Sequence, residues 1–151
     1  MLQLKIPPPV YLLLAALCMW LLDRYFPIIE LIHAPWNKVG FLFVILGMTS
    51  DGSSLVQFFR AHTTMNPLHP ENTKKLVTTG MYSLTRNPMY LGLVSVLFGW
   101  GVILASLSTF IILPLFVWVM TVQQIIPEEQ ILEQKFGQDY LDYKIAVKRW
   151  L

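Results

Sequence analysis

Two polar clusters frame a long uncharged stretch of this chain. The first contains Arg86, Asn87 and Pro88, the second contains Glu128 and Glu129, and no Asp, Glu, Lys or Arg lies between Arg86 and Glu128. An arginine and a carboxylate pair can bind a charged ligand through charge-assisted hydrogen bonds. A carboxylate beside a membrane span is costly without a partner. These clusters are therefore the candidate chemistry of the chain.

The uncharged stretch predicts that the two clusters meet. At ~1.5 Å per helical residue, about forty residues cover roughly twice the ~30 Å bilayer core, which indicates two spans joined by a turn. The turn is expected at residues 105–108, near the middle of the stretch. A membrane hairpin returns to the face it left, so Arg86 and Glu128 should lie on one surface, close enough to share a ligand.

Composition indicates the class of protein. The chain has 151 residues, of which 55% are hydrophobic and 13% charged, and this favours one integral membrane bundle. A net charge of +2 gives no field that would attract nucleic acid. Cys18 is the only cysteine, so no internal disulfide can form. The histidines, His33, His62 and His69, lie in predicted loops without helical pairing, and no metal or haem site is expected.

The chain is predicted to be one all-α membrane domain, 1–151, with about four spans. The first span is expected at 9–22, and the second starts near Trp36 and is interrupted at Asp51 and Gly52. Basic residues place the polar loop on the cytoplasmic side, which puts both termini there. The expected membrane is a bacterial inner membrane. The expected parts are two N-terminal spans at 1–59, the cytoplasmic motif loop at 60–87, the helical hairpin at 88–126 and a C-terminal cytoplasmic helix at 127–151.

The C-terminal segment is predicted to be an amphipathic helix that begins at Pro127 and is bent or divided at Gly137. Its aromatic residues are expected at the lipid boundary and its basic residues toward anionic headgroups. These residues are Tyr143, Lys144, Lys148, Arg149 and Trp150.

Each candidate residue also has a structural interpretation. Arg86 could be a membrane anchor beside a helix start, although nearby glycines and tyrosines favour a planar ligand. The glutamate pair could be a solvated first turn of a helix. Asp51 lies within a predicted span, where an ionisable group indicates function, but it could equally cap a helix break at Gly52. Both interpretations of Asp51 stay open.

The paired motifs LVTTGMYSLTRNPMYLG and PEEQILEQKFGQDYLDYKIAVKRWL, separated by a hairpin, resemble the isoprenylcysteine carboxyl methyltransferase family and its bacterial relatives, which are also similar to the phospholipid N-methyltransferases. The resemblance covers about residues 60–151. It implies that S-adenosylmethionine binds at the cytoplasmic surface and that a lipophilic acceptor enters from the bilayer. The eukaryotic members have His where this chain has Asn87, so no histidine-dependent role carries over.

Position by position, the resemblance implies two catalytic residues, Arg86 and Glu128, and a set of cofactor-binding residues with no metal. The implied cofactor-binding residues are Val77, Gly80, Met81, Tyr82, Arg86, Asn87, Pro88, Tyr90, Leu91, Glu128 and Glu129.

The implied reaction is methyl transfer to a carboxylate, an amine or a thiol, in which placement of the reactants dominates. One alternative is a phospholipid amine N-methyltransferase. A second, from another class, is a non-catalytic membrane scaffold or transporter subunit. A small bundle with few spans also makes a homo-oligomer an open expectation.

Overall fold

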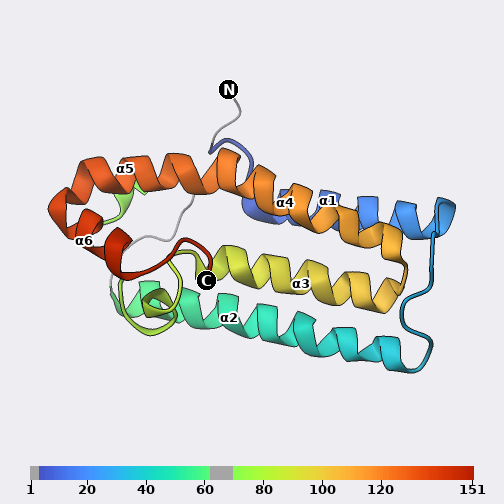
Figure 1. Cartoon of the computed structure of the whole chain (residues 1–151). Helices are drawn as coiled ribbons and strands as arrows, with labels where there is room; N and C mark the ends of the chain where they lie inside the picture. The colour runs from blue at the N-terminus through green and yellow to red at the C-terminus, as the bar shows by residue number, and fades with distance from the viewer. Residues whose placement is uncertain (1–3, 62–69) are drawn as a thin grey trace.

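The computed structural model describes residues 4–61 and 70–151, and the described chain is helical apart from one isolated bridge between Glu30 and Ser106. His62 and His69 lie outside the described residues. The main helices run as an elongated bundle in Figure 1. They are α1 (Pro8–Tyr25), α2 (Gly40–Arg60), α3 (Pro88–Leu104), α4 (Ile112–Met120), α5 (Ile126–Phe136) and α6 (Gln138–Ala146).

Shorter turns connect these helices. Three-ten turns occur at Trp36–Val39, Pro70–Asn72, Gly80–Ser83 and Leu107–Ile111, and a π-helical segment, Thr121–Ile125, joins α4 to α5. The polar motif loop therefore holds two of these short turns. Because α4 follows the 107–111 turn without a break and α5 follows the π segment, one long apolar helix runs over 107–136.

Helices α2 and α3 pack closely because glycines line their contact. A Cβ atom at Gly47 would lie 2.5 Å from the carbonyl oxygen of Gly92, and one at Gly99 would lie 2.5 Å from that of Gly40. The hydroxyl of Ser95 donates to the carbonyl of Phe43 at 2.9 Å across the same contact. Gly99 therefore marks a site of close helix packing.

At the end of the bundle opposite the motif loop, the connection between α1 and α2 is hydrogen-bonded to the hairpin turn. Helix α3 ends at Ala105, which has a left-handed φ of 67°. The backbone N–H of Leu31 donates to the carbonyl of Ala105 at 2.7 Å, and that of Leu107 donates to Ile29 at 2.9 Å. The predicted turn near 105–108 is confirmed, and Figure 1 shows both connections at one end.

Several predicted boundaries are wrong. Helix α2 is continuous through Asp51 and Gly52, because the hydroxyls of Ser53 and Ser54 bond the carbonyl of Ser50 at 2.8 and 2.9 Å inside the helix. The first helix extends over Pro8–Tyr25 rather than 9–22.

The C-terminal segment also differs from its prediction in where it begins. Pro127 lies within a longer helical run and does not begin it. The backbone N–H of Ile126 donates to the carbonyl of Thr121 in π-helical geometry, and Pro127, which follows, has no backbone N–H to donate. Gly137, with a φ of 54°, divides α5 from α6 as predicted.

The core of the bundle is apolar and so is much of its outer surface. Met19, Leu97, Met120 and Ile125 are fully buried between the helices. Large apolar side chains on the outside include Phe41 and Trp118, at 56% and 62% exposure, a pattern typical of surfaces that face lipid.

Two helical segments within the described residues are long and apolar enough to cross a membrane, Trp36–Arg60 and Leu107–Phe136, while Pro88–Leu104 is apolar but shorter. The structure therefore supports a helical membrane protein with two candidate spans.

Candidate active site

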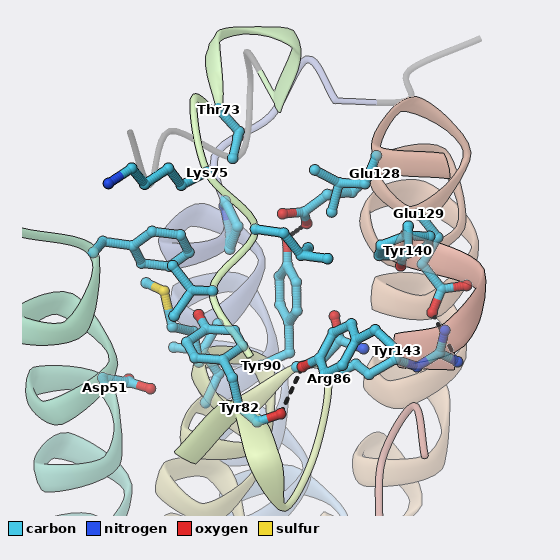
Figure 2. A pocket seen from close by; sticks show the side chains of 18 of the residues that line it. Asp51, Thr73, Lys75, Tyr82, Arg86, Tyr90, Glu128, Glu129, Tyr140 and Tyr143 are labelled. Atoms are coloured by element: carbon cyan, nitrogen blue, oxygen red, sulfur yellow. Dashed lines mark hydrogen bonds and ion pairs between the residues drawn. The ribbon is translucent and has the colours of Figure 1, made fainter. Parts of the chain in front are cut away.

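A cavity of about 370 Å³ lies at the motif-loop end of the bundle. Figure 2 shows side chains from α2, the loop before α3, the start of α3, α5 and α6 converging on it. Seven predicted site residues line this cavity, which are Val77, Tyr82, Arg86, Asn87, Tyr90, Glu128 and Glu129. The structure thus brings both polar clusters to one cavity, as the hairpin prediction required.

Tyr90 and Glu128 join the two arms of the hairpin. Pro88 occupies the first turn of α3, and Tyr90 lies two residues on, with only 6% of its surface exposed. Its hydroxyl donates to Oε2 of Glu128 at 3.0 Å. A phenol that donates to a carboxylate stabilises the charged form and fixes the orientation of the carboxylate. The Glu128 carboxylate is therefore held at the cavity wall.

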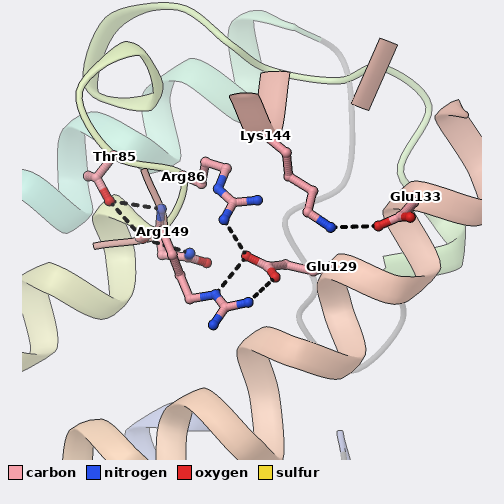
Figure 3. A network of polar contacts seen from close by, with 7 residues as sticks. Thr85, Arg86, Glu129, Glu133, Lys144 and Arg149 are labelled. Atoms are coloured by element: carbon pink, nitrogen blue, oxygen red, sulfur yellow. Dashed lines mark hydrogen bonds and ion pairs between the residues drawn. The ribbon is translucent and has the colours of Figure 1, made fainter. Parts of the chain in front are cut away.

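Glu129 forms an ion-pair network with two arginines, shown in Figure 3. Its Oε1 lies 3.2 Å from Nη2 of Arg86, and its two oxygens accept from Nε and Nη2 of Arg149 at 3.1 and 2.7 Å. The side chains of Arg86 and Glu129 are 9% and 8% exposed. Because a buried carboxylate needs a charged partner, this network fixes the arginine cluster against α5.

The role expected for Arg149 is therefore wrong. The sequence placed Arg149 and Lys144 toward lipid headgroups, but Arg149 binds Glu129, and Lys144 lies 2.8 Å from Glu133. The hydrogen bonds that Arg149 donates to Glu129 raise the pKa of Arg149, so this guanidinium stays protonated. The C-terminal segment folds back so that Arg149 provides a counter-charge for the buried Glu129. Helical periodicity does not reveal this contact.

The C-terminal backbone is attached to the motif loop. Thr85 and Asn87 both donate to the carbonyl of Arg149, at 3.1 and 2.9 Å, and the backbone N–H of Arg86 donates to the carbonyl of Lys148 at 2.9 Å. Asn87 is 8% exposed, and its amide group is occupied by this contact. The loop and the tail therefore position each other.

An aromatic wall covers one side of the cavity. The hydroxyl of Tyr143 donates to the carbonyl of Tyr82 at 2.6 Å, and the rings of Phe58 and Tyr82 meet edge to face at 5.4 Å. Tyr140 is 2% exposed. Burial raises the pKa of Tyr82, Tyr140 and Tyr143, so all three phenols stay protonated. Tyr143 is buried rather than at the lipid boundary, which corrects its expected place.

Four other predicted site residues, Gly80, Met81, Pro88 and Leu91, do not line the cavity. Gly80 has a φ of +63°, and a Cβ there would lie 2.6 Å from the side chain of Gln57. It shapes the loop that carries Tyr82.

Sequence reasoning missed several lining residues, among them Phe58, Tyr140 and Tyr143. Tyr140 and Tyr143 lie on the apolar face predicted for the C-terminal helix, so the periodicity indicated that this face is covered. Only the structure shows which part of the molecule covers this face.

Asp51 lies on the cavity wall formed by α2. Because α2 is unbroken, the prediction that Asp51 caps a helix break is wrong. Its Oδ1 is buried and has no hydrogen-bond partner among the described residues, and it packs against Gly92 of α3, where a Cβ atom would overlap it. Gly92 is one of the glycines near Arg86, and the space beside it is filled by this carboxylate and not by a ligand.

Known proteins match the chain over most of the segment that forms this cavity. The family described as phospholipid methyltransferase matches residues 36–139. Protein-S-isoprenylcysteine O-methyltransferase B of Arabidopsis thaliana is 31% identical over 107 residues, which cover 71% of this chain and 54% of the relative. The rat protein-S-isoprenylcysteine O-methyltransferase is 32% identical over 122 residues, which cover 78% of this chain and 42% of the relative.

An uncharacterized protein of Haemophilus influenzae is 40% identical over 63 residues, which cover 42% of this chain and all of that protein. The chain spans about half the length of the isoprenylcysteine methyltransferases it matches, 54% in the plant case. No solved structure matches it significantly. Since the family match covers more than half of the chain, including the α2, α3 and α5 walls of the cavity, this protein belongs to the phospholipid methyltransferase family, alongside the isoprenylcysteine carboxyl methyltransferases.

Proposed function

We propose that this chain is a membrane-embedded methyltransferase that uses S-adenosylmethionine to methylate a lipophilic acceptor. The observation that carries the proposal is the Tyr90–Glu128 hydrogen bond of 3.0 Å, which joins the two motifs across one cavity. A volume of about 370 Å³ lies in the range of small-molecule sites. Family membership supports the same reaction class.

The groups around the cavity fit the proposed methyl donor. Nε and Nη1 of Arg86 are buried N–H groups without a partner among the described residues, and they suit a carboxylate. The carboxyl group of Glu128 offers oxygen acceptors to the ammonium or the ribose hydroxyls of the donor. The rings of Tyr82 and Tyr140 offer flat surfaces for an adenine.

S-adenosylmethionine supplies an electrophilic methyl group, and the protein supplies placement. Arg86 is fixed by Glu129, and Glu128 is oriented by Tyr90, so both groups are preorganised before any ligand binds. The aromatic wall of Tyr82, Tyr140 and Tyr143 excludes water from that side. Arg86 and Glu128 are the proposed catalytic residues. The remaining predicted cofactor residues, Gly80, Met81, Pro88 and Leu91 included, are proposed to bind or shape the donor site.

The acceptor is proposed as a lipophilic carboxylate, amine or thiol. The plant and rat relatives are named for isoprenylcysteine, whereas the family is described by phospholipid. The family description favours the alternative of a phospholipid amine N-methyltransferase, and labelled methyl groups in headgroup lipids would identify it. A scaffold or transporter subunit would show no saturable binding of S-adenosylhomocysteine.

The proposed topology has four spans with the cavity end, and both termini, on the cytoplasmic side of a bacterial inner membrane. Its support is that residues 7–9 line the cavity and Arg149 pairs with Glu129 of its wall, while the 26–39 connection and the 105–106 turn meet at the opposite end. A homo-oligomer stays a prediction. Accessibility labelling of single cysteines placed at each end would test the topology.

The test of the function uses Arg86→Ala and Glu128→Ala. Both variants should insert in the membrane and lose transfer of labelled methyl groups from S-adenosylmethionine, because one lacks the anion-binding donors and the other the oriented carboxylate. Arg24→Ala, an exposed residue in the last turn of α1, is the matched control and should keep activity. Unchanged activity in both site variants would refute their assigned roles.

A further inference from the structure

Arg149 is a charged residue of the ion-pair network that lies outside the cavity lining. Its guanidinium binds both oxygens of Glu129, with Nε 3.1 Å from Oε1 and Nη2 2.7 Å from Oε2. Arg86, which does line the cavity, reaches the same carboxylate with Nη2 alone, at 3.2 Å from Oε1. Figure 3 shows the two arginines meeting at this one glutamate. Glu129 is therefore held mainly by the arginine that does not face the cavity.

The three side chains of this network, two guanidiniums and one carboxylate, carry a net charge of +1. Arg149 is 36% exposed, so water can solvate its charge, whereas Arg86 is only 9% exposed. Nε and Nη1 of Arg86 have no hydrogen-bond partner among the described residues. A buried cation that is only partly compensated is costly, so the cavity wall at Arg86 favours a ligand with an anionic group.

The neighbouring Glu128 does not take the place of that ligand. Its Oε2 accepts from the hydroxyl of Tyr90 at 3.0 Å, and no ion pair joins it to Arg86 in the part of the chain that the structure describes. Without Arg149, Glu129 and Arg86 would form a neutral pair, and Glu129 could accept from a second nitrogen of Arg86. Arg149 therefore prevents Arg86 from being neutralised by its own counter-charge.

The C-terminal segment fixes the place of Arg149. Two residues before it, Val147 is 9% exposed within the aromatic cluster of α6, and Trp150, the next residue, packs against the main core. The backbone carbonyl of Arg149 accepts from the side chains of Thr85 and Asn87 at 3.1 and 2.9 Å. Because the backbone is held on both sides, the guanidinium is preorganised against Glu129.

We propose that Arg149 is a positioning residue of the donor site, which occupies Glu129 so that Arg86 can bind the carboxylate of the methyl donor. This inference rests on the proposed methyltransferase function. Arg149 needs no contact with the ligand, because it acts through Glu129 and Arg86. Its removal should weaken ligands that carry the amino-acid carboxylate and spare those that lack it, whereas a purely structural role would affect both kinds of ligand equally.

The test uses two ligands that differ only in this carboxylate, S-adenosylhomocysteine and its decarboxylated analogue. Each is titrated by calorimetry into the full chain in lipid nanodiscs. The wild-type chain should bind S-adenosylhomocysteine at least about tenfold more tightly than the analogue. Arg149→Gln should lose about tenfold in affinity for S-adenosylhomocysteine and less than about twofold for the analogue, because residues of one ion-pair network are coupled.

Arg149→Lys separates the charge of Arg149 from its shape. An ammonium still neutralises Glu129, although it cannot form the two-point contact, so the affinity for S-adenosylhomocysteine should stay within about threefold of the wild-type value. Lys144→Gln is the matched control. Lys144 also pairs with a glutamate of α5 and is 33% exposed, but its partner, Glu133, does not line the cavity. This control should leave both affinities unchanged.

Four results would overturn the inference. They are equal binding of the two ligands by the wild-type chain, an unchanged affinity for S-adenosylhomocysteine or an equal loss for both ligands in Arg149→Gln, a loss in Arg149→Lys as large as that in Arg149→Gln, and a loss of the same size in Lys144→Gln. Absence of S-adenosylhomocysteine binding in the wild-type chain would instead overturn the proposed function itself.

Discussion

Substitution of Glu129 by glutamine should destabilise the protein strongly. The change removes the counter-charge from Arg86, whose side chain is 9% exposed, and breaks one of the two hydrogen bonds that Arg149 donates to the carboxylate. Breaking a buried pair costs about 3–5 kcal/mol, because the remaining charge stays uncompensated. The glutamine oxygen still accepts one hydrogen bond and Arg149, at 36% exposure, can turn to water, so the lower end of about 3 kcal/mol is expected.

Glu133→Gln gives the matched control for this prediction. Glu133 lies one turn further along α5 and pairs with Lys144 at 2.8 Å, but the two side chains are 40% and 33% exposed. Surface pairs contribute about 0–1 kcal/mol, so this variant should unfold near the wild-type midpoint.

The assay is reversible unfolding in mixed micelles of mild detergent and dodecyl sulfate, followed by circular dichroism. Glu129→Gln should shift the midpoint far below that of Glu133→Gln, and the free-energy difference between them should be about 2 kcal/mol or more. Equal midpoints would refute the conclusion that burial of the Arg86–Glu129 pair stabilises the site.

Two further substitutions, the second with a control in α2, test other parts of the structure. Tyr90→Phe removes the hydrogen bond to Glu128 without changing the ring. Because hydrogen bonds to charged groups contribute about 1.5–3 kcal/mol, the rate of methyl transfer should fall at least about tenfold. An unchanged kcat would show that the carboxylate needs no orientation by Tyr90. Gly80→Ala places a Cβ at a left-handed backbone position and against the side chain of Gln57, so it should lower the free energy of unfolding by about 1–2 kcal/mol. Gly52→Ala is the control, because its Cβ would meet open space in helix α2. In the same unfolding assay it should be neutral or should raise the free energy of unfolding by up to about 1 kcal/mol. The reverse order would contradict the loop geometry.

The hairpin was predictable because it depends on length and charge alone. A stretch of about forty uncharged residues is long enough to cross a bilayer twice, and the position of the turn follows from the midpoint, so the meeting of Arg86 with the glutamate pair required no knowledge of packing. Periodicity also predicted which face of the C-terminal helix is covered, and Gly137 predicted where that helix divides.

The pairing of charges was not predictable from the sequence. Arg149 lies 20 residues beyond Glu129, and helical spacing relates only residues within about a turn of each other. The continuity of α2 was missed for a similar reason. Gly52 and two serines suggest a break by propensity, but the serine hydroxyls bond inside the helix and the packing of α2 on α3 outweighs the local preference.

The most direct test of the account is calorimetric titration of the purified protein with S-adenosylhomocysteine. The wild-type chain should bind one equivalent with saturable affinity, and Arg86→Ala should weaken that affinity at least about tenfold, since a lost charge-assisted hydrogen bond costs about 1.5–3 kcal/mol. No saturable heat from a folded, membrane-extracted wild-type protein would contradict the assignment of this cavity to a sulfonium nucleotide.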